Sequence, residues 1–297
     1  MSSQPKIVVT GGNGQLGKEL QEISSSYPQF QFYFLSREDM PLDQFELVRN
    51  YFNTLKPAYC INCAAYTAVD KAESEKELAF LVNSEAVGVL AAVCKEHDTK
   101  IIHISTDYVF NGEATYPYTE NFPTDPINIY GASKLEGERN TMQFNPDSIV
   151  IRTSWLYSSY GRNFVKTMMR LMNEKDEVKV INDQVGSPTY AADLAEVILK
   201  IIGDGHPDSH RERTNKWVPG IYNFSNEGII TWYEFAVAIK EIINCPCDVK
   251  PITTSEYPTP ARRPAYSVLD KTKIQETFGV QLKDWKESLA VCISKIK

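Results

Sequence analysis

The feature that most constrains the fold is a short apolar run that leads directly into a glycine-rich turn. Lys6–Thr10 has the β-branched, apolar composition of a buried strand, and Gly-Gly-Asn-Gly-Gln-Leu-Gly follows at residues 11–17. Apolar residues then recur at helical spacing. A strand, a glycine turn and a helix in this order are typical of a site that holds a dinucleotide pyrophosphate at the helix N-terminus. We predict that Gly11, Gly14 and Gly17 form such a site, with a purely structural turn as the alternative.

Predicted strands and helices alternate along the rest of the chain. Apolar runs at residues 31–35, 59–63, 100–104 and 148–152 are predicted strands, and residues 74–97 have a helical pattern. Further helices are expected at residues 163–172, 193–202, 231–243 and 283–296, with strands at 178–181 and 220–224. This alternation predicts an α/β fold with a Rossmann-like, doubly wound parallel sheet that binds ligands at the carboxyl ends of its strands.

The residues after the second predicted strand bear on the choice of dinucleotide. An acidic residue there would accept hydrogen bonds from the ribose of NAD, whereas this chain has Ser36 and Arg37. A hydroxyl and a guanidinium favour the 2′-phosphate of NADPH. Because Asp39 and Asp43 lie close by, NADH stays open as an alternative, and Asp43 with Gln44 could instead approach the adenine ring.

Tyr130 and Lys134 are the candidate catalytic pair. They are one helical turn apart, so their side chains share a face of the helix. A phenol beside an ammonium is a proton donor with a lowered pKa, and Thr106, which follows the fourth strand, could hold the substrate oxygen or the tyrosine hydroxyl. A surface tyrosine beside a solvated lysine is the alternative. His103, inside the fourth strand, is predicted to be a packed core residue.

Composition narrows the function classes. The 297 residues carry a net charge of -7, which disfavours a nucleic-acid role because phosphate backbones recruit excess Lys and Arg. The sequence shows no signal-peptide pattern, and we expect no membrane span and a cytoplasmic location. Six cysteines in a chain of this length predict no disulfide framework, and no metal site is predicted. Residues 203–219, with His206 and His210, are predicted to form a polar surface loop.

Several motifs carry a resemblance to a known family. Three of them together resemble the extended short-chain dehydrogenase/reductase superfamily: Thr10-Gly11-x-x-Gly14-x-x-Gly17, Ser105-Thr106-Asp107-Tyr108-Val109-Phe110 and Tyr130-Gly131-x-Ser133-Lys134. Residues 62–73, 152–157 and 180–189, and the Tyr-Pro-Thr-Pro-Ala-Arg-Arg-Pro loop at 257–264, are similar to the dTDP-4-dehydrorhamnose reductase family. The resemblance covers nearly the whole chain.

The resemblance implies reduction of the C4 ketone of dTDP-4-dehydro-β-L-rhamnose to dTDP-β-L-rhamnose by hydride from NAD(P)H. It implies that Tyr130 donates the proton, that Lys134 binds the nicotinamide ribose and holds the tyrosine pKa down, and that Thr106 hydrogen-bonds the reacting oxygen. It also places Asp107 and Trp155 against the sugar, although a plain core aromatic stays open for Trp155. The predicted cofactor contacts are Gly11, Gly14, Gln15, Leu16, Gly17, Ser36, Arg37, Asp43, Gln44, Ala64, Ala65, Tyr66, Thr67, Ile104, Tyr130 and Lys134.

A basic pair in the proline-rich loop is the candidate handle for the substrate. Arg262 and Arg263 lie between Pro260 and Pro264, which stiffen the loop by fixing φ. Guanidinium groups bind phosphate oxygens in a bidentate manner, which suits the pyrophosphate of a dTDP-sugar. The match to the Pro-Ala-x-Arg-Pro motif favours Arg263 more than Arg262. A solvated pair of surface arginines is the alternative.

The resemblance also implies a division into two domains. At one position the sequence departs from the family pattern. Residues 1–155, with return segments at about 190–204 and 220–226, would form the dinucleotide-binding domain, and residues 156–189 and 227–297 a smaller mixed α/β substrate domain. Some family members are described as magnesium-dependent dimers with acidic ligands. Glu19 matches the first ligand position, but Ala192 stands at the second. This departure weighs against Mg²⁺ and against that homodimer.

Two other functions remain open. The chain could be a reductase or epimerase of another nucleotide sugar, because Tyr-x-x-x-Lys specifies the chemistry and not the sugar. It could also be a non-catalytic NADP-binding regulatory subunit, resembling the β subunit of methionine adenosyltransferase. Intact Thr106, Tyr130 and Lys134 favour catalysis.

Overall fold

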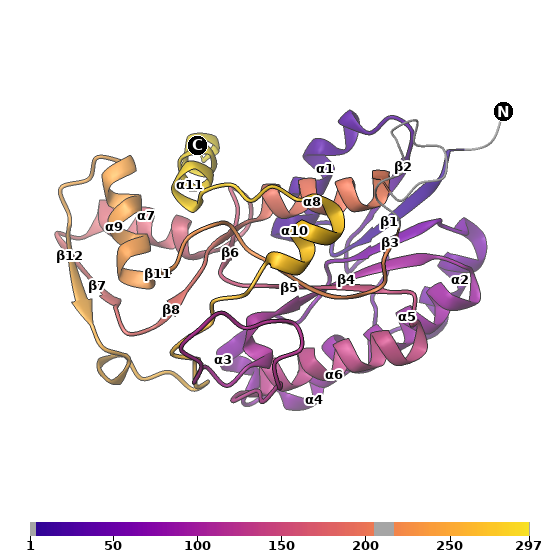
Figure 1. Ribbon diagram of the computed structural model, residues 1–297, viewed down its shortest axis with the longest axis horizontal. Helices are drawn as coiled ribbons and strands as arrows, with labels where there is room; N and C mark the ends of the chain where they lie inside the picture. Colours follow the sequence, from indigo (N-terminus) through magenta and orange to yellow (C-terminus); the bar gives the residue numbers. More distant parts are fainter. Residues whose placement is uncertain (1–3, 205–216, 297) are drawn as a thin grey trace.

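A six-stranded parallel sheet is the centre of the computed structural model, which describes residues 4–204 and 217–296 (Figure 1). The strand order is β10-β5-β4-β3-β1-β2. The strands are β1 Lys6–Thr10, β2 Gln31–Leu35, β3 Tyr59–Asn62, β4 Lys100–Thr106, β5 Ile149–Thr153 and β10 Gly220–Phe224. The order reverses between β1 and β3, the kind of switch point at which open α/β sheets bind ligands. The predicted doubly wound parallel sheet is confirmed.

Helices cover both faces of this sheet. On one face lie α1 Gln15–Ile23 and α8 Ala191–Asp204, and on the other α2 Phe45–Leu55, α5 Ala86–Glu96 and α6 Ile129–Phe144 (Figure 1). Successive strand residues point to opposite faces, so Ile7 and Val9 pack in the core on the α1 side, while Val8 packs in the core on the α2 side. The strands are therefore mostly apolar on both faces, with a few buried polar residues such as Asn62 and His103.

The long apolar helical region before β4 is interrupted by a wider turn. It consists of α4 Lys76–Phe80, a π-helical segment Leu81–Glu85, and α5. With 21 residues and a mean hydropathy of 1.6, this region could cross a membrane by length and composition alone, so the expectation that no apolar run is long enough was wrong. More than half of it is buried against the sheet and α6, which is the environment of a core helix.

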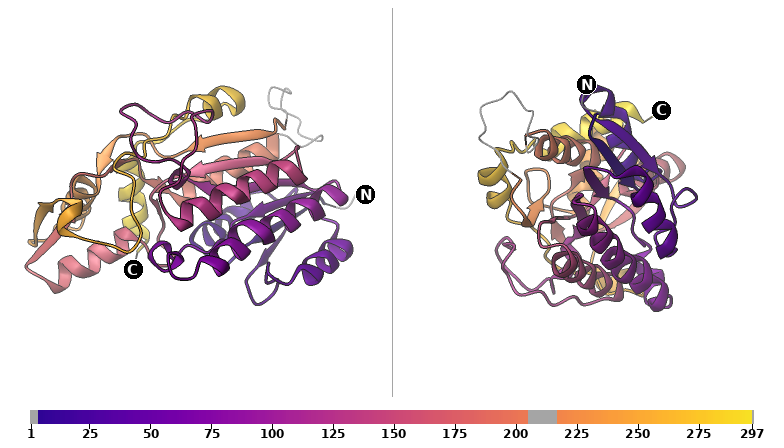
Figure 2. Two further views of the ribbon diagram at one scale, coloured as in Figure 1. Left: turned by 90° about the horizontal axis from the view of Figure 1, so that it is seen from below. Right: turned by 90° about the vertical axis from the view of Figure 1, so that its right-hand side faces the viewer.

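A smaller domain lies beyond the carboxyl ends of the strands (Figures 1 and 2). Its core is formed by residues from three helices and a parallel strand pair. These elements are α7 Phe164–Glu174, α9 Trp232–Ile242, α11 Trp285–Lys295, and the pair β7 Glu177–Ile181 with β12 Asp248–Ile252. Two short pairs connect it to the sheet, β6 Leu156–Tyr157 with β9 Thr189–Tyr190 and β8 Val185–Gly186 with β11 Ile230–Thr231.

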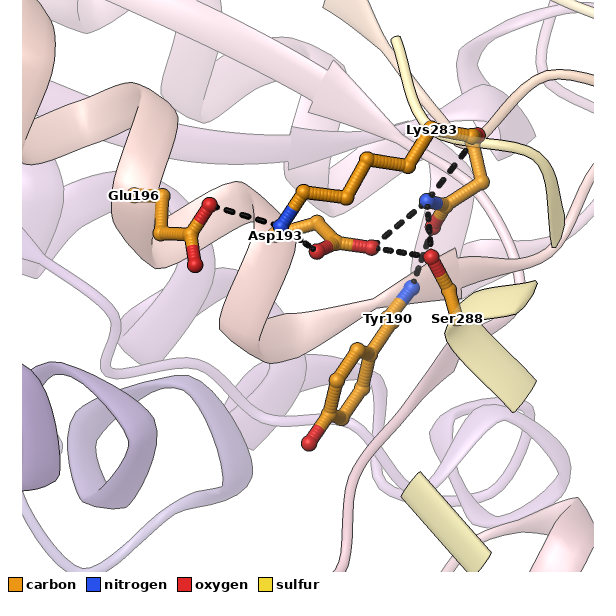
Figure 3. A network of polar contacts seen from close by, with 6 residues as sticks. Tyr190, Asp193, Glu196, Lys283 and Ser288 are labelled. Atoms are coloured by element: carbon orange, nitrogen blue, oxygen red, sulfur yellow. Dashed lines mark hydrogen bonds and ion pairs between the residues drawn. The ribbon is translucent and has the colours of Figure 1, made fainter. Parts of the chain in front are cut away.

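A buried polar network joins the two domains (Figure 3). Asp193 of α8 accepts hydrogen bonds from Asn226 at 2.7 Å and from Ser288 of α11 at 2.5 Å, and pairs with Lys283 at 2.8 Å. Lys283 also reaches Glu196 at 2.7 Å. Because a carboxylate buried at this junction has all these partners, the network fixes how α11 sits on α8.

Some elements differ from the predictions. The helix α2 and the strand β12 were not predicted. A short helix α10, Thr272–Phe278, packs its Phe278 ring 4.9 Å from Tyr222 of β10, so this part of residues 227–297 lies on the large sheet and not in the substrate domain. Most of the predicted polar loop, including His206 and His210, lies outside the described residues.

Candidate active site

The start of α6 brings Tyr130 against the end of β4. The Asn128 side chain caps the helix by accepting a hydrogen bond from Gly131 N at 2.7 Å. A Cβ on Gly131 would lie 2.1 Å from the carbonyl oxygen of Tyr108, so only glycine lets the helix approach the turn after β4 this closely. The rings of Tyr108 and Tyr130 pack edge to face with centroids 5.7 Å apart. This packing fixes the direction of the Tyr130 phenol.

Burial, and not Lys134, decides the protonation of Tyr130. Loss of solvent raises the pKa of Tyr130 to about 12, although a hydrogen bond with Thr106 opposes the rise. The predicted lowering by Lys134 was therefore wrong for this state of the protein. The Lys134 amine instead donates to the carbonyl oxygen of Ile104 at 2.6 Å, and burial lowers the pKa of Lys134 to about 8. With a pKa of about 12, the Tyr130 phenol holds its proton at neutral pH and can act as an acid.

Asp107 is a buried carboxyl beside these groups. Its side chain is only 2% exposed, and Thr106 Oγ1 donates to its Oδ1 at 3.0 Å. The Oδ2 atom is buried without a hydrogen-bond partner in the part of the chain that the structure describes. Desolvation raises the pKa of Asp107 to about 7. The predicted contact of Asp107 with the sugar stays a prediction, and the Oδ2 atom is available for it.

Asp107→Asn should make the protein more stable at alkaline pH. Folded Asp107 keeps its proton up to a pKa of about 7, whereas the unfolded chain releases it from an ordinary value of 3.8. The free energy of unfolding of the natural protein therefore falls as pH rises between these values. The difference between 3.8 and about 7 gives the variant a gain on the order of 4 kcal/mol at pH 8, and less than about 1 kcal/mol at pH 4. Urea unfolding at both pH values measures this, and an equal difference at both would contradict the assignment.

The glycine turn after β1 is shaped for close backbone approach. Gly11 has φ +65°, and a Cβ there would lie 2.8 Å from Ala64 N. A Cβ on Gly17 would lie 2.5 Å from the Gly11 carbonyl oxygen, so glycine is required for α1 to pack on the turn. No side chain caps α1 at Gly14, which leaves the first N–H groups of the helix for an anion. These features fit a dinucleotide pyrophosphate.

The two other predicted residues of this turn are engaged in the fold. Leu16 is buried in the core on the α1 side of the sheet, so only its backbone could touch a cofactor. The Gln15 side chain accepts a hydrogen bond from Asn163 at the start of α7, at 2.9 Å. This bond links the glycine turn to the smaller domain.

The predicted ribose-side residues lie together at the end of β2. Ser36 donates through both its backbone N and its hydroxyl to Asp39, at 2.8 and 2.7 Å, so its hydroxyl is occupied. Arg37 has 77% of its side chain exposed and pairs only loosely with Asp43, at 3.8 Å. Gln44 is the residue before α2. Of this group, Arg37 has the charge and the freedom to bind a 2′-phosphate.

The segment after β3 is hydrogen-bonded to Asn83 of the π-helical segment. Asn83 accepts a hydrogen bond from Tyr66 N at 2.8 Å and donates to Tyr66 O at 3.0 Å. It also donates to Ser133 of α6 at 3.0 Å. Asn83 is thus a core amide that fixes the backbone of the predicted cofactor residues Ala64, Ala65, Tyr66 and Thr67.

The two arginines of the proline-rich loop have different environments. Arg263 is bidentate with Asp70, at 3.0 and 2.8 Å, and also bonds to Thr259 and the Ala261 carbonyl. Arg262 is exposed, and its guanidinium has no partner among the described residues. Both line a cavity of about 440 Å³ between this loop and Asp183. Asp70 already neutralises Arg263, which favours Arg262 as the cation free to bind a phosphate, and the choice of Arg263 as the substrate handle stays a prediction.

Trp155 follows β5 in a strained conformation. Its φ is +47°, which a bulky residue rarely adopts, and its ring stacks on Trp232 with centroids 3.7 Å apart. The ring is partly exposed and packs against the core of the smaller domain. Strained residues cluster at functional sites, so the sugar contact stays a prediction beside the core role.

The positions at which some family members are described as binding magnesium do not fit a divalent cation in this chain. Glu19 is fully buried, and its Oε1 accepts a hydrogen bond from Ser158 at 2.6 Å. Burial raises the pKa of Glu19. Ala192 offers no oxygen ligand, and residues 4–204 and 217–296 contain no cluster of three His, Cys, Asp or Glu side chains. A hard cation needs several oxygen ligands, which this set does not supply.

Sequence reasoning missed three residues around the site. Asp70 belongs to a motif that was quoted, but nothing in its spacing indicated a partner in the distant loop. Tyr108 packs on Tyr130, and His103 lies 3.4 Å from the Lys134 amine. A histidine inside an otherwise apolar strand was the available signal, and it was assigned to packing alone.

The fold and the site together define a dinucleotide-dependent oxidoreductase of the extended short-chain dehydrogenase/reductase type. The family model described as RmlD substrate binding domain matches residues 5–297. The dTDP-4-dehydrorhamnose reductase of Aggregatibacter actinomycetemcomitans is 40% identical, over 96% of this chain and 97% of that protein. The chain belongs to the dTDP-4-dehydrorhamnose reductase family.

Two solved structures of similar proteins agree with this assignment. A dTDP-4-dehydrorhamnose reductase from Clostridium acetobutylicum has a TM-score of 0.91 at 41% identity, covering 97% of this chain and 98% of that one. A dTDP-4-dehydrorhamnose reductase from Bacillus anthracis, in complex with NADP, has a TM-score of 0.91 at 37% identity, covering 99% and 100%. Both cover the sheet and the smaller domain.

Proposed function

We propose that this protein reduces the C4 ketone of dTDP-4-dehydro-β-L-rhamnose to dTDP-β-L-rhamnose with NADPH. The observation that carries the proposal is the position of Thr106, Tyr130 and Lys134 at the carboxyl end of β4. The turn after β1, in which Gly11 and Gly17 are required, is the second part of the site. Substrate and cofactor are soluble, so we place the activity in the cytoplasm, where it would supply a sugar nucleotide for polysaccharide synthesis.

Each residue has a distinct chemical task in this proposal. Bound NADPH would supply the hydride. Tyr130, protonated at neutral pH, gives its proton to the carbonyl oxygen that becomes the new hydroxyl. Thr106 keeps the phenol and the carbonyl oxygen in line through its hydrogen bond with Tyr130. Lys134, whose amine donates to the Ile104 carbonyl oxygen, would bind the nicotinamide ribose of the cofactor.

Purified protein with dTDP-4-dehydrorhamnose and NADPH tests this function directly. Loss of NADPH absorbance together with formation of dTDP-rhamnose is the expected result. Turnover of a different nucleotide sugar in its place would favour a related reductase or epimerase. NADPH binding without turnover of any sugar would favour the regulatory subunit.

Arg37→Ala should weaken the binding of NADPH much more than the binding of NADH. The exposed guanidinium would bind only the 2′-phosphate, which NADH lacks, so the variant should lose at least about tenfold in NADPH affinity. Titration of both dinucleotides by protein fluorescence measures this. Arg170→Ala removes an exposed arginine of α7 and is the matched control, expected to change neither affinity. Equal losses for NADPH and NADH would show that Arg37 is an ordinary surface charge.

Arg262→Ala and Arg263→Ala should separate substrate binding from loop structure. Arg262 is free to meet the pyrophosphate, so its loss should raise KM for the dTDP-sugar tenfold or more, about 1.4 kcal/mol, without lowering the melting temperature. Arg263→Ala leaves Asp70 unpaired and should lower the melting temperature, whatever it does to KM. An unchanged KM in Arg262→Ala would exclude it as the substrate handle.

A further inference from the structure

Three polar side chains cross three neighbouring strands of the sheet at one level. Thr10 of β1 is the register partner of Asn62 of β3, and Asn62 is the register partner of His103 of β4. All three are at most 1% exposed. We call Thr10, Asn62 and His103 the polar ladder. Its first member directly precedes Gly11 of the dinucleotide turn, and its last lies under α6.

The polar ladder ends on the catalytic lysine. Thr10 Oγ1 donates to Asn62 Oδ1 at 2.6 Å, and Asn62 Nδ2 lies 3.0 Å from His103 Nδ1. His103 Nε2 lies 3.4 Å from Lys134 Nζ, which also donates to the Ile104 carbonyl oxygen at 2.6 Å. The mechanism assigns no role to this buried imidazole, although it is a direct neighbour of Lys134.

Proton counting shows that the ladder has two consistent arrangements. Burial holds the pKa of His103 well below its usual value, so the ring is neutral and has one N–H donor and one acceptor nitrogen. With the Asn62 amide donating to Nδ1, the ring proton sits on Nε2 and faces Lys134. That geometry needs an uncharged amine as acceptor, because an ammonium group has none.

The second arrangement accommodates the charged lysine. If the Asn62 amide turns over, its oxygen accepts from Nδ1–H and its NH₂ donates to Thr10 Oγ1. Nε2 is then free to accept from the Lys134 ammonium. The ladder can therefore match either charge state of the lysine by moving one ring proton and rotating one amide, without moving the backbone.

We propose that His103 is a positioning residue that acts through Lys134, holding its amine at the Ile104 carbonyl and supporting it in both charge states. The use of that lysine in turnover rests on the proposed function. The ladder makes no contact with the reacting atoms, so its effect on chemistry is indirect. No residue of this ladder was among the predicted site residues.

Among the residues that the structure describes, two other titratable side chains affect the pKa of Lys134. Glu138, one turn further along α6, favours the ammonium form, and the Cys63 thiol after β3 acts in the same direction. Glu138 is itself paired with Arg152 of β5 at 2.7 Å, which offsets its charge. Tyr130 lies on the same face of α6. His103 is the group that contacts the amine from the β4 side.

Two amide variants of His103 test the proposal. Glutamine can place its terminal amide near the position of Nε2, within reach of Lys134, whereas asparagine reaches only toward Asn62. His103→Asn should lower kcat at least about tenfold and move the alkaline limb of its pH profile to lower pH, because the ammonium loses an acceptor. His103→Gln should keep most of the activity. Equal losses and identical pH profiles in two folded variants would show that His103 only packs.

The natural protein offers a readout that does not depend on turnover or on the folding of a His103 variant. Nitrogen-15 spectra of the His103 ring should show a neutral ring whose proton moves from Nδ1 to Nε2 as pH rises through the pKa of Lys134. Lys134→Met should abolish that movement. A ring that titrates near its ordinary pKa, or a proton that never moves, would overturn the proposal. If the protein reduces no sugar nucleotide, the proposed function fails while this test still decides the role of His103.

Discussion

Tyr130→Phe should cut turnover of the dTDP-sugar by roughly two to four orders of magnitude, the usual contribution of a positioned general acid. Phenylalanine keeps the ring that packs on Tyr108 and removes only the hydroxyl that bonds to Thr106. The site should therefore keep its shape, and NADPH affinity should stay within about threefold. Steady-state kinetics and a dinucleotide titration on the same preparation measure both quantities.

A neighbouring tyrosine provides the control for this variant. Tyr108→Phe removes a phenol whose ring touches that of Tyr130 but to which no chemical step is assigned. We expect it to retain activity within about tenfold. If Tyr130→Phe also retained near-natural turnover, the proton would have to come from another group, and Asp107 would be the first candidate to examine.

Glu138→Ala should destabilise the protein by about 3–5 kcal/mol, the usual result of leaving one member of a buried ion pair without its partner. Glu138 and Arg152 are each 2% exposed and joined by bonds of 2.7 to 3.2 Å. Ser105 also donates to the Glu138 carboxylate at 2.5 Å, so the variant strands two buried donors. Urea unfolding gives the free energy, and its midpoint should fall markedly.

Two comparisons make this result interpretable. Glu174→Ala breaks an ion pair with Arg170 of which both members are more than half exposed, and should cost less than about 0.5 kcal/mol. The double variant Glu138→Leu with Arg152→Met removes both buried charges and should recover much of the loss. A Glu138→Ala protein as stable as Glu174→Ala would mean that water reaches the buried guanidinium.

The fold was largely predictable because most residues of its strands are apolar. Residues 6–10, 31–35 and 220–224 match the observed strands end to end, although β2 and β10 are the edge strands of the sheet and are only partly buried. The helix α2 was overlooked although Val48 and Phe52 are its buried residues at helical spacing. The short charged strand β12 has only Val249 buried and gives no comparable signal.

The site was predictable in its local motifs but not in its long-range partners. Tyr130 and Lys134 could be predicted because they are one helical turn apart, and Thr106 because it follows a predicted strand. Asp70 and Arg263 are far apart in the sequence, and no spacing rule connects them. The direction of the Tyr130 pKa was also inaccessible, because desolvation depends on how deeply the finished fold buries the phenol.

The position of β10 has a consequence for how the protein is made. This strand pairs with β5 at the edge of the sheet, yet α7, β7 and α8 all precede it in the chain. A chain leaving the ribosome therefore cannot complete its larger domain first and its smaller domain afterwards, as proteins with consecutive domains do. Until Phe224 has emerged, the outer side of β5 is an open strand edge that can pair with other chains. The period of synthesis between residues 153 and 224 is the interval in which a chaperone would matter most for this protein.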